Sequence, residues 1–260
     1  MTEILDNVLV LDVKDVSESD QIVIFLKKPG IKLAGFAKGA RKSHKRFVNT
    51  LQPLNYITLK YKTTPSGSWL QESKLIRPYI VGRENYELLG TKHVIREALL
   101  KLLPENDRYE GLFDLVISCL TVLDKKKKLE PAGILCIFLV RYMSLLGYMP
   151  PFDKCSICGK ELEKTERWVW QLVPIRTTCA IHRLSGSLKW EWDLEILKIL
   201  QNIPQWPVDK LWNIKITRSK QRTLLHNLST WFEVTAHKKL RSLLWLQRTM
   251  ENVNSQNSGS

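Results

Sequence analysis

The first eighty residues contain short runs rich in the apolar, β-branched and aromatic residues that favour β-strands. Turn sequences separate these stretches, including Lys28-Pro29-Gly30 and Thr64-Pro65-Ser66-Gly67-Ser68. The predicted strands are Val8–Val13, Gln21–Leu26, Ile31–Lys38, Leu54–Lys62 and Trp69–Ile76. Five short strands in about eighty residues favour a small barrel, because closing the sheet removes the unpaired edges that an open sheet exposes.

From about residue 85 the apolar positions recur at helical spacing instead. The predicted helices are Tyr86–Leu103, Tyr109–Leu123, Ala132–Leu146, one that begins in Asp193–Leu200, and one or two amphipathic helices in Ser219–Met250. Pro131 and Gly147 flank the third helix, as is usual at the start and just past the end of a helix. Residues 150–190 have no clear period and are predicted to be irregular.

The change of period predicts an α+β protein with two main regions. Residues 1–80 form a β-barrel domain, and residues 81–252 form a helical domain into which residues 150–190 are inserted. The last residues, 253–260, are polar and are expected to be a disordered tail. No internal repeat is visible.

The inserted region carries two pairs of potential metal ligands. Cys155 and Cys158 have two residues between them, as do Cys179 and His182, and twenty residues separate the pairs. Zn²⁺ takes four sulfur or nitrogen ligands in a tetrahedron, and two ligands on one tight turn reach the same ion. Gly159 directly follows the first pair, where such a turn often needs a left-handed backbone. We therefore expect one structural Zn²⁺, because four protein ligands leave no open position for catalysis.

The other cysteines suggest no competing role. An odd count of five in an apparently cytosolic chain argues against a disulfide framework. Cys119 and Cys136 lie in apolar helical runs, where cysteine behaves as a small buried hydrophobe. One alternative is that Cys155 and Cys158 form a redox pair, but a redox dithiol needs no second, matching pair. His182 is the least typical of the four ligands, and His237 is its only rival.

The chain is strongly basic, with a net charge of +14 and a sequence pI near 9.6 over 260 residues. Such an excess repels itself in a compact protein and usually has an anionic partner, first nucleic acid and second a membrane surface. The apolar runs are too short to cross a bilayer, and the amino terminus does not read as a signal peptide. We expect a cytoplasmic protein, associated with the nucleoid if DNA is its partner.

The densest basic stretch lies in the predicted barrel. Between Asp20 and Glu72 the sequence has no acidic residue but ten cations. They are Lys27, Lys28, Lys32, Lys38, Arg41, Lys42, Lys45, Arg46, Lys60 and Lys62. Ten unopposed cations indicate a phosphate-binding surface, because a merely solvated face usually mixes charges. Gly39 lets backbone amides approach a phosphate, and Phe36 and Phe47 can stack on bases. For Phe47 a place in the barrel core is as good an interpretation.

We therefore assign nucleic-acid binding to Lys38, Arg41, Lys42, Lys45, Arg46 and Phe36. A second basic cluster near the C-terminus comprises Lys215, Arg218, Lys220, Arg222, Lys238, Lys239 and Arg241. On amphipathic helices these cations are more often a solvated face than a binding site.

Several stretches of the chain resemble one family, the bacterial DNA repair and recombination protein RecO. The resemblance rests on Phe36-Ala-Lys-Gly-Ala-Arg-Lys-Ser43, Arg46-Phe47, Leu51-Gln-Pro-Leu54, the Cys155–His182 pairs and Leu240-Arg-Ser-Leu-Leu-Trp245. No single motif is highly specific, but their order and spacing together are. Two departures concern the local loop: Pro174–Thr178 replaces a glycine pair, and His182 stands where the family often has cysteine.

The resemblance implies an oligonucleotide/oligosaccharide-binding (OB) barrel, a helical domain and a zinc-bearing insertion. It also implies binding to single- and double-stranded DNA, strand annealing, and a partnership with RecR. With RecR, such a protein helps to load the RecA recombinase onto DNA that is coated by single-strand DNA-binding protein. The acidic tail of the single-strand DNA-binding protein is expected to dock in an apolar groove flanked by cations on the helical domain.

Enzymatic activity is not expected, and no catalytic residues are assigned. The sequence has no Gly-rich phosphate loop for ATP hydrolysis, and no paired acidic motif for a two-metal nuclease site. The alternative is a zinc-containing RNA-binding or transcription-associated protein. Binding assays with RNA and DNA at matched salt separate the two interpretations.

Overall fold

The computed structural model describes residues 2–65, 67–80, 85–125, 130–149, 152–161, 168–172, 175–182, 189–192 and 194–257. The chain divides into two compact units, Met1–Lys127 and Lys128–Ser260. Helices α1 and α2 therefore belong to the same compact unit as the strands before them, and the domain boundary at residue 80 stays a prediction. No helix in the described ranges combines the length and the apolar character that crossing a membrane requires.

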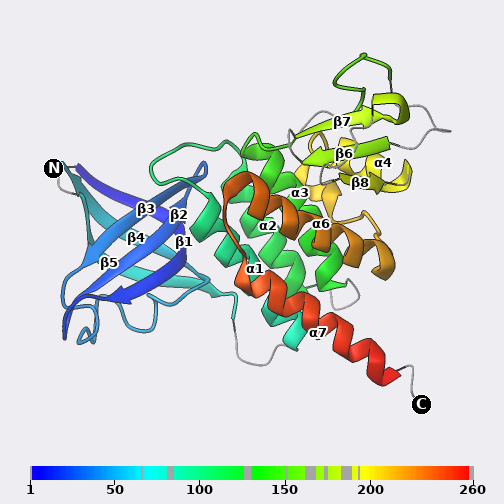
Figure 1. Cartoon of the computed structure of the whole chain (residues 1–260). Coiled ribbons are helices and arrows are strands. Elements are labelled where there is room, and N and C mark those ends of the chain that lie inside the picture. Colours follow the sequence, from blue (N-terminus) through cyan, green and yellow to red (C-terminus); the bar gives the residue numbers. More distant parts are fainter. Residues whose placement is uncertain are drawn as a thin grey trace. The chain divides into compact units, whose positions relative to one another are not determined.

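The first unit contains a closed five-stranded barrel with the order β1-β2-β3-β5-β4 (Figure 1). The strands are β1 (Thr2–Asp15), β2 (Gln21–Lys27), β3 (Ile31–Ala37), β4 (Asn55–Thr64) and β5 (Gly67–Pro78). All neighbouring pairs are antiparallel except β3 and β5, which pair in parallel at Gly35–Ser68 and Phe36–Trp69. The predicted barrel is confirmed. Its inward positions alternate with outward ones, and Val10, Phe25 and Leu59 are fully buried inside it.

Two helices complete the first unit, α1 (Tyr86–Leu102) and α2 (Leu112–Lys125). Asn85 caps α1 by accepting a 2.8 Å hydrogen bond from the Leu88 N–H. The second helix begins at Leu112 rather than at the predicted Tyr109. The reason is Gly111, whose φ of 78° lies in the left-handed region and is incompatible with a right-handed helix.

A buried charge network ties these helices to the end of β5. The Lys92 side chain is 1% exposed, and its ammonium donates to the Tyr79 carbonyl at 2.5 Å and to the Asp124 carboxylate at 2.8 Å. Arg77 donates to the other Asp124 oxygen at 3.0 Å. Arg96 of α1 also pairs with Asp12 of β1. Because Asp124 balances a buried ammonium, removing it would leave an uncompensated charge in the interior.

The second unit is built around α3 (Pro131–Leu145), most of whose residues are buried. The other elements are β6 (Trp168–Leu172), β7 (Ile175–Cys179), a 3₁₀ turn at Ala180–His182, β8 (Lys189–Trp192), α4 (Leu194–Asn202), α5 (Val208–Leu211), α6 (Arg218–Ala236) and α7 (Arg241–Asn257). The predicted amphipathic region is thus two helices. His237 ends α6 with a φ of 50°, and its N–H bonds back to the Phe232 carbonyl, a common helix terminus.

Two predictions for this unit are wrong. The prediction that residues 150–190 are irregular is wrong for two described stretches, Trp168–Leu172 and Ile175–Cys179, because β6, β7 and β8 form an antiparallel sheet with the order β7-β6-β8. Its strands are four or five residues long, too short to show a period in sequence. The polar tail from residue 253 is helical as far as Asn257, and residues 258–260 lie outside the described residues. Extending an existing helix requires no new nucleus, so polar residues can continue it.

Candidate nucleic-acid interface and metal centre

The four predicted metal ligands lie together in the second unit. The ligand atoms of Cys155, Cys158, Cys179 and His182 are all within 4.8 Å of one another. Cys158 Sγ is 4.0 Å from Cys179 Sγ, and His182 Nδ1 is 3.3 Å from Cys179 Sγ and 3.8 Å from Cys155 Sγ. Tetrahedral Zn²⁺ places two sulfurs about 3.8 Å apart, and a sulfur and a nitrogen about 3.5 Å apart. The donor set and its spacing therefore fit a four-coordinate metal ion.

The backbone explains how each pair converges. Gly159 has a φ of 71°, and its N–H donates to the Cys155 carbonyl at 2.9 Å, which closes the turn that was predicted at this glycine. The Ser156 N–H donates to the Thr177 carbonyl at 2.9 Å, so this turn is fastened to β7. Cys179 ends β7, and the following 3₁₀ turn brings His182 back over it. The departure at Pro174–Thr178 is thus a strand over its described part, Ile175–Thr178.

The electrostatics of the cluster favour a bound cation. Burial alone would raise the pKa of Cys155, but N–H groups of Cys158, Cys179 and Ile157 outweigh it and lower the pKa to about 6. The Lys160 N–H favours the Cys158 thiolate, yet desolvation and the neighbouring Cys155 and Cys179 raise its pKa. Several thiolates this close repel one another unless a cation lies between them. Cys119 and Cys136 are buried, as predicted.

The ten cations of the barrel are not unopposed, so that part of the prediction is wrong. Six of them pair with carboxylates from other parts of the first unit: Lys27 with Asp6, Lys28 with Asp114, Arg41 with Asp15, Lys42 with Glu18, and Lys60 and Lys62 with Glu3. Lys32 is 5% exposed, and its ammonium donates to the Leu100 carbonyl at 2.9 Å. These partners could not be identified from the sequence because they are distant from the basic stretch along the chain. They lie in β1, in the loop after β1 and in α2, which the fold of the first unit places next to the basic stretch.

Three cations of the stretch remain exposed and pair with no carboxylate in the described parts of the chain: Lys38, Lys45 and Arg46. Arg46 donates to the Lys38 carbonyl at 2.8 Å, and the Ser73 N–H donates to the Arg46 carbonyl at 2.8 Å. These bonds hold the loop against β5. The N–H of Gly39 is occupied, because it donates to Asp20 at 2.7 Å and thereby lowers the pKa of that carboxyl.

Lys45 and Arg46 line a groove on the outer face of β1, β4 and β5. We call it the basic groove; its lining residues are Leu5, Lys45, Arg46, Thr58, Lys60, Glu72, Ser73 and Lys74. Glu72 is the one carboxylate among these residues, against four cations. Lys74 is exposed, faces Thr58 across the β4–β5 pair, and has no carboxylate partner within the described ranges. Sequence reasoning missed Lys74 because it lies beyond Glu72, although it stands at an outward position of a predicted strand.

The two phenylalanines have different surroundings. Phe47 is 4% exposed and belongs to the barrel core, so the core interpretation is confirmed for it. Phe36 is half-buried on the outer face, and its ring lies 5.1 Å from that of Trp69. Trp69 keeps 44% of its surface exposed. It was predicted only as part of a strand.

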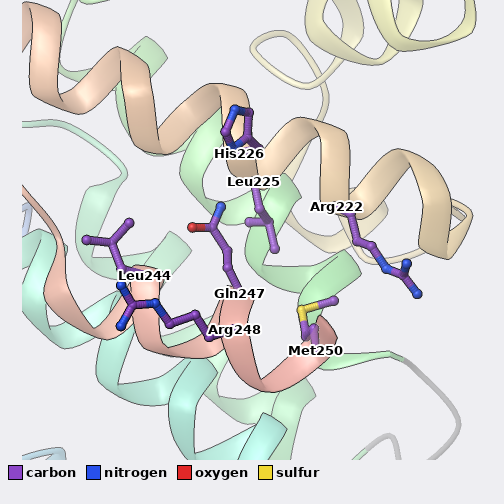
Figure 2. Close-up of a pocket in the computed structure, with 7 residues that line it drawn as sticks. All are labelled: Arg222, Leu225, His226, Leu244, Gln247, Arg248 and Met250. Carbon is purple, nitrogen blue, oxygen red and sulfur yellow. The ribbon is translucent and has the colours of Figure 1, made fainter. Parts of the chain in front are cut away.

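The C-terminal cations of the second unit are dispersed, and three of the seven form ion pairs that the structure describes. Arg218 pairs with Glu130, Lys220 with Glu195, and Lys239 with Glu233 at 3.3 Å. This pattern agrees with a solvated helical face. Arg222 differs, because it lines a groove between α6 and α7 together with Arg248, Leu225 and Met250 (Figure 2). We call this the helical groove; His226, Leu244 and Gln247 complete it. In Figure 2 the apolar Leu225 and Met250 lie between the two arginines.

Comparisons with known proteins match both parts of the chain to the same protein family. Residues 1–79 match the family model described as recombination protein O N terminal, and residues 83–244 match recombination protein O C terminal. The DNA repair protein RecO of Syntrophobacter fumaroxidans is 30% identical over 240 residues, which is 92% of this chain and 95% of that protein. The DNA repair protein RecO of Thermodesulfovibrio yellowstonii is 30% identical over 205 residues, 77% of this chain and 80% of that protein.

Proposed function

Because the chain belongs to the recombination protein O (RecO) family, we propose that it acts in DNA repair as a DNA-binding recombination mediator and not as an enzyme. The observation that carries the proposal is the basic groove. Lys45, Arg46 and Lys74 are exposed and lack carboxylate partners among the described residues, and rigid barrel strands support them. Cations on a rigid base bind phosphates with little cost of ordering, and such contacts carry no sequence preference.

The proposed activity is annealing of complementary strands. With RecR, the protein helps to load RecA on DNA coated by single-strand DNA-binding protein. DNA contacts are assigned to Lys38, Lys45 and Arg46 of the predicted set, with Arg41 and Lys42 secondary because Asp15 and Glu18 already pair with them. Lys74 joins this set. The Cys155–His182 cluster holds one Zn²⁺ whose role is to fold the second unit, since the four ligands leave no position for a substrate.

The helical groove is the proposed docking site for the acidic tail of single-strand DNA-binding protein. Leu244 is half-buried and offers apolar surface to a peptide, beside the buried Leu225 and Met250. Arg222 and Arg248 offer charges that attract a carboxylate-rich peptide. Neither arginine pairs with a carboxylate within the described residues. Arg222→Glu and Arg248→Glu should each weaken binding of a labelled tail peptide about tenfold or more, whereas Lys238→Glu should change it less than twofold. Equal loss in all three variants would place the peptide elsewhere.

The whole proposal is tested by annealing of complementary oligonucleotides, bare and coated with single-strand DNA-binding protein. The protein should accelerate both reactions. If about five phosphates are neutralised, log affinity for a single strand should fall against log salt with a slope of about −3 to −4. A matched RNA strand should bind no more tightly than DNA. Tighter binding to RNA and no annealing would favour the RNA-binding alternative instead.

A further inference from the structure

The outer face of the barrel presents two aromatic rings side by side. Phe36 of β3 and Trp69 of β5 are register partners where these strands pair in parallel. Their ring centroids are 5.1 Å apart, and the ring planes meet at 73°. An edge-to-face pair leaves ring surface uncovered, and Trp69 is 44% exposed.

Phe36 and Trp69 are not part of the barrel core. Ala37 and Leu70, the next residues along each strand, are buried inside the barrel. Because side chains alternate across a strand, Phe36 and Trp69 point to the outer face. An exposed tryptophan on a rigid strand loses little conformational freedom when a flat ligand covers it.

Cations lie beside the rings. Lys38 follows Phe36 by two residues, and Lys62, which pairs with Glu3, is the register partner of Trp69 on β4. Along β5 from Trp69 lies Lys74, a member of the basic groove, about 16 Å away at the rise of an extended strand. An aromatic surface followed by a row of phosphate-binding cations matches a single nucleic-acid strand, whose bases and phosphates are exposed together.

We infer that Phe36 and Trp69 form a stacking platform for an unpaired base, and that this platform makes the barrel prefer single-stranded DNA to duplex. The inference rests on the proposed function and adds the strand preference to it. The cations cannot supply such a preference alone, because both forms of DNA offer phosphates. A duplex base is already stacked and paired, so it reaches the platform only after being extruded, which is unfavourable.

The test compares Trp69→Ala with the wild-type chain on a labelled oligothymidine and on a duplex of equal length at fixed salt. Affinity for the single strand should fall about 5- to 100-fold, while affinity for the duplex should change less than twofold. The salt slope should be unchanged, because no charge is removed. Trp69→Phe should keep most of the affinity. Trp245→Ala, which removes a tryptophan that is 47% exposed on α7, is the matched control and should bind normally.

Fluorescence gives a second measurement that does not depend on Trp69→Ala folding normally. Oligothymidine should quench tryptophan emission of the wild-type chain, and the quenching should be smaller in Trp69→Phe than in Trp245→Phe. Unchanged single-strand affinity, or an equal loss on both DNA forms, would overturn the platform while leaving DNA binding intact. Failure of the wild-type chain to bind any DNA would instead overturn the proposed function itself.

Discussion

The barrel and the region of residues 152–192 that holds the candidate metal ligands, here called the metal-binding region, are expected to achieve stability in opposite ways. The barrel closes on itself through strand pairing and surrounds a core that includes Phe25 and Leu59. The metal-binding region has strands of four or five residues, and its four candidate metal ligands lie where its two turns meet. In the barrel, the side chains proposed to bind DNA lie outside the core. In the metal-binding region, we expect the side chains that would bind the ion to be the ones that hold the structure.

This difference predicts that changes in the two regions have separable effects. A barrel cation should affect DNA binding without affecting stability, whereas a metal ligand should affect stability first. Because the chain divides into two compact units, we expect that one can unfold while the other persists.

The largest effect is expected from the metal ligands. Cys155→Ser or Cys179→Ser should abolish binding of one Zn²⁺ per chain and unfold much of the second unit, because structural zinc contributes about 10 kcal/mol or more in small zinc domains. Elemental analysis of protein purified without chelator, with thermal melting, checks this. Ser156→Ala, between two ligands, is the control and should keep both the metal and the melting temperature. Well under one equivalent of zinc in the wild-type chain would contradict the zinc assignment.

The second-largest effect is expected from the buried ion pair of the first unit, between Lys92 and Asp124. Asp124→Ala should lower the free energy of unfolding of the first unit by about 3–5 kcal/mol, since it removes a carboxylate that pairs with the buried ammonium of Lys92. Asp114→Ala removes a carboxylate that is 61% exposed from its pair with Lys28, and it should cost under about 1 kcal/mol. Denaturant unfolding measures both variants. Equal losses would show that burial of Lys92 does not govern the stability of this unit.

Much of the fold could be predicted because it follows from local pattern. The five strands are β-rich runs separated by turn sequences, and the glycine after Cys158 signals the tight turn. The metal cluster was predictable for the same reason, because its spacing is local within each pair. The short strands β6–β8 were missed, since their four or five residues are too few for a period. The helical end of α7 was missed because polar residues extended an existing helix.

The nucleic-acid surface was only partly predictable because charge pairing is a tertiary property. Arg41 and Lys42 have no acidic residue within twenty positions on either side in the sequence. In the structure Arg41 nevertheless pairs with Asp15 at the end of β1, and Lys42 pairs with Glu18 in the loop between β1 and β2. Lys74 was excluded by an acidic residue two positions before it in sequence. Trp69 looked like any strand residue, and only the pairing of β3 with β5 places it beside Phe36.

A smaller effect separates the cations of the barrel from one another. Lys45→Ala/Lys74→Ala removes two groove cations without carboxylate partners in the described chain, and should make the salt slope for single strands shallower by about 1.4 units. Arg41→Ala/Lys42→Ala removes the same charge, but these cations already pair with carboxylates, so it should change the slope by less than half as much. Anisotropy titrations at several salt concentrations compare the two. If the second variant lost more, the strand would follow the loop after β3 rather than the basic groove.

The smallest effect is expected from the C-terminal cations. Lys238→Ala/Lys239→Ala/Arg241→Ala removes three positive charges, one more than either barrel variant, yet should weaken single-strand binding less than about twofold. Lys239 already pairs with Glu233 at 3.3 Å, and these residues border the turn between α6 and α7 rather than lining a groove. If binding depended only on net charge, this variant would lose the most. Normal annealing by the Lys45/Lys74 variant together with failure of this one would move the DNA-binding surface to the second unit. That result would break the separation between the two regions, because the unit that needs the metal to fold would then also bind the DNA.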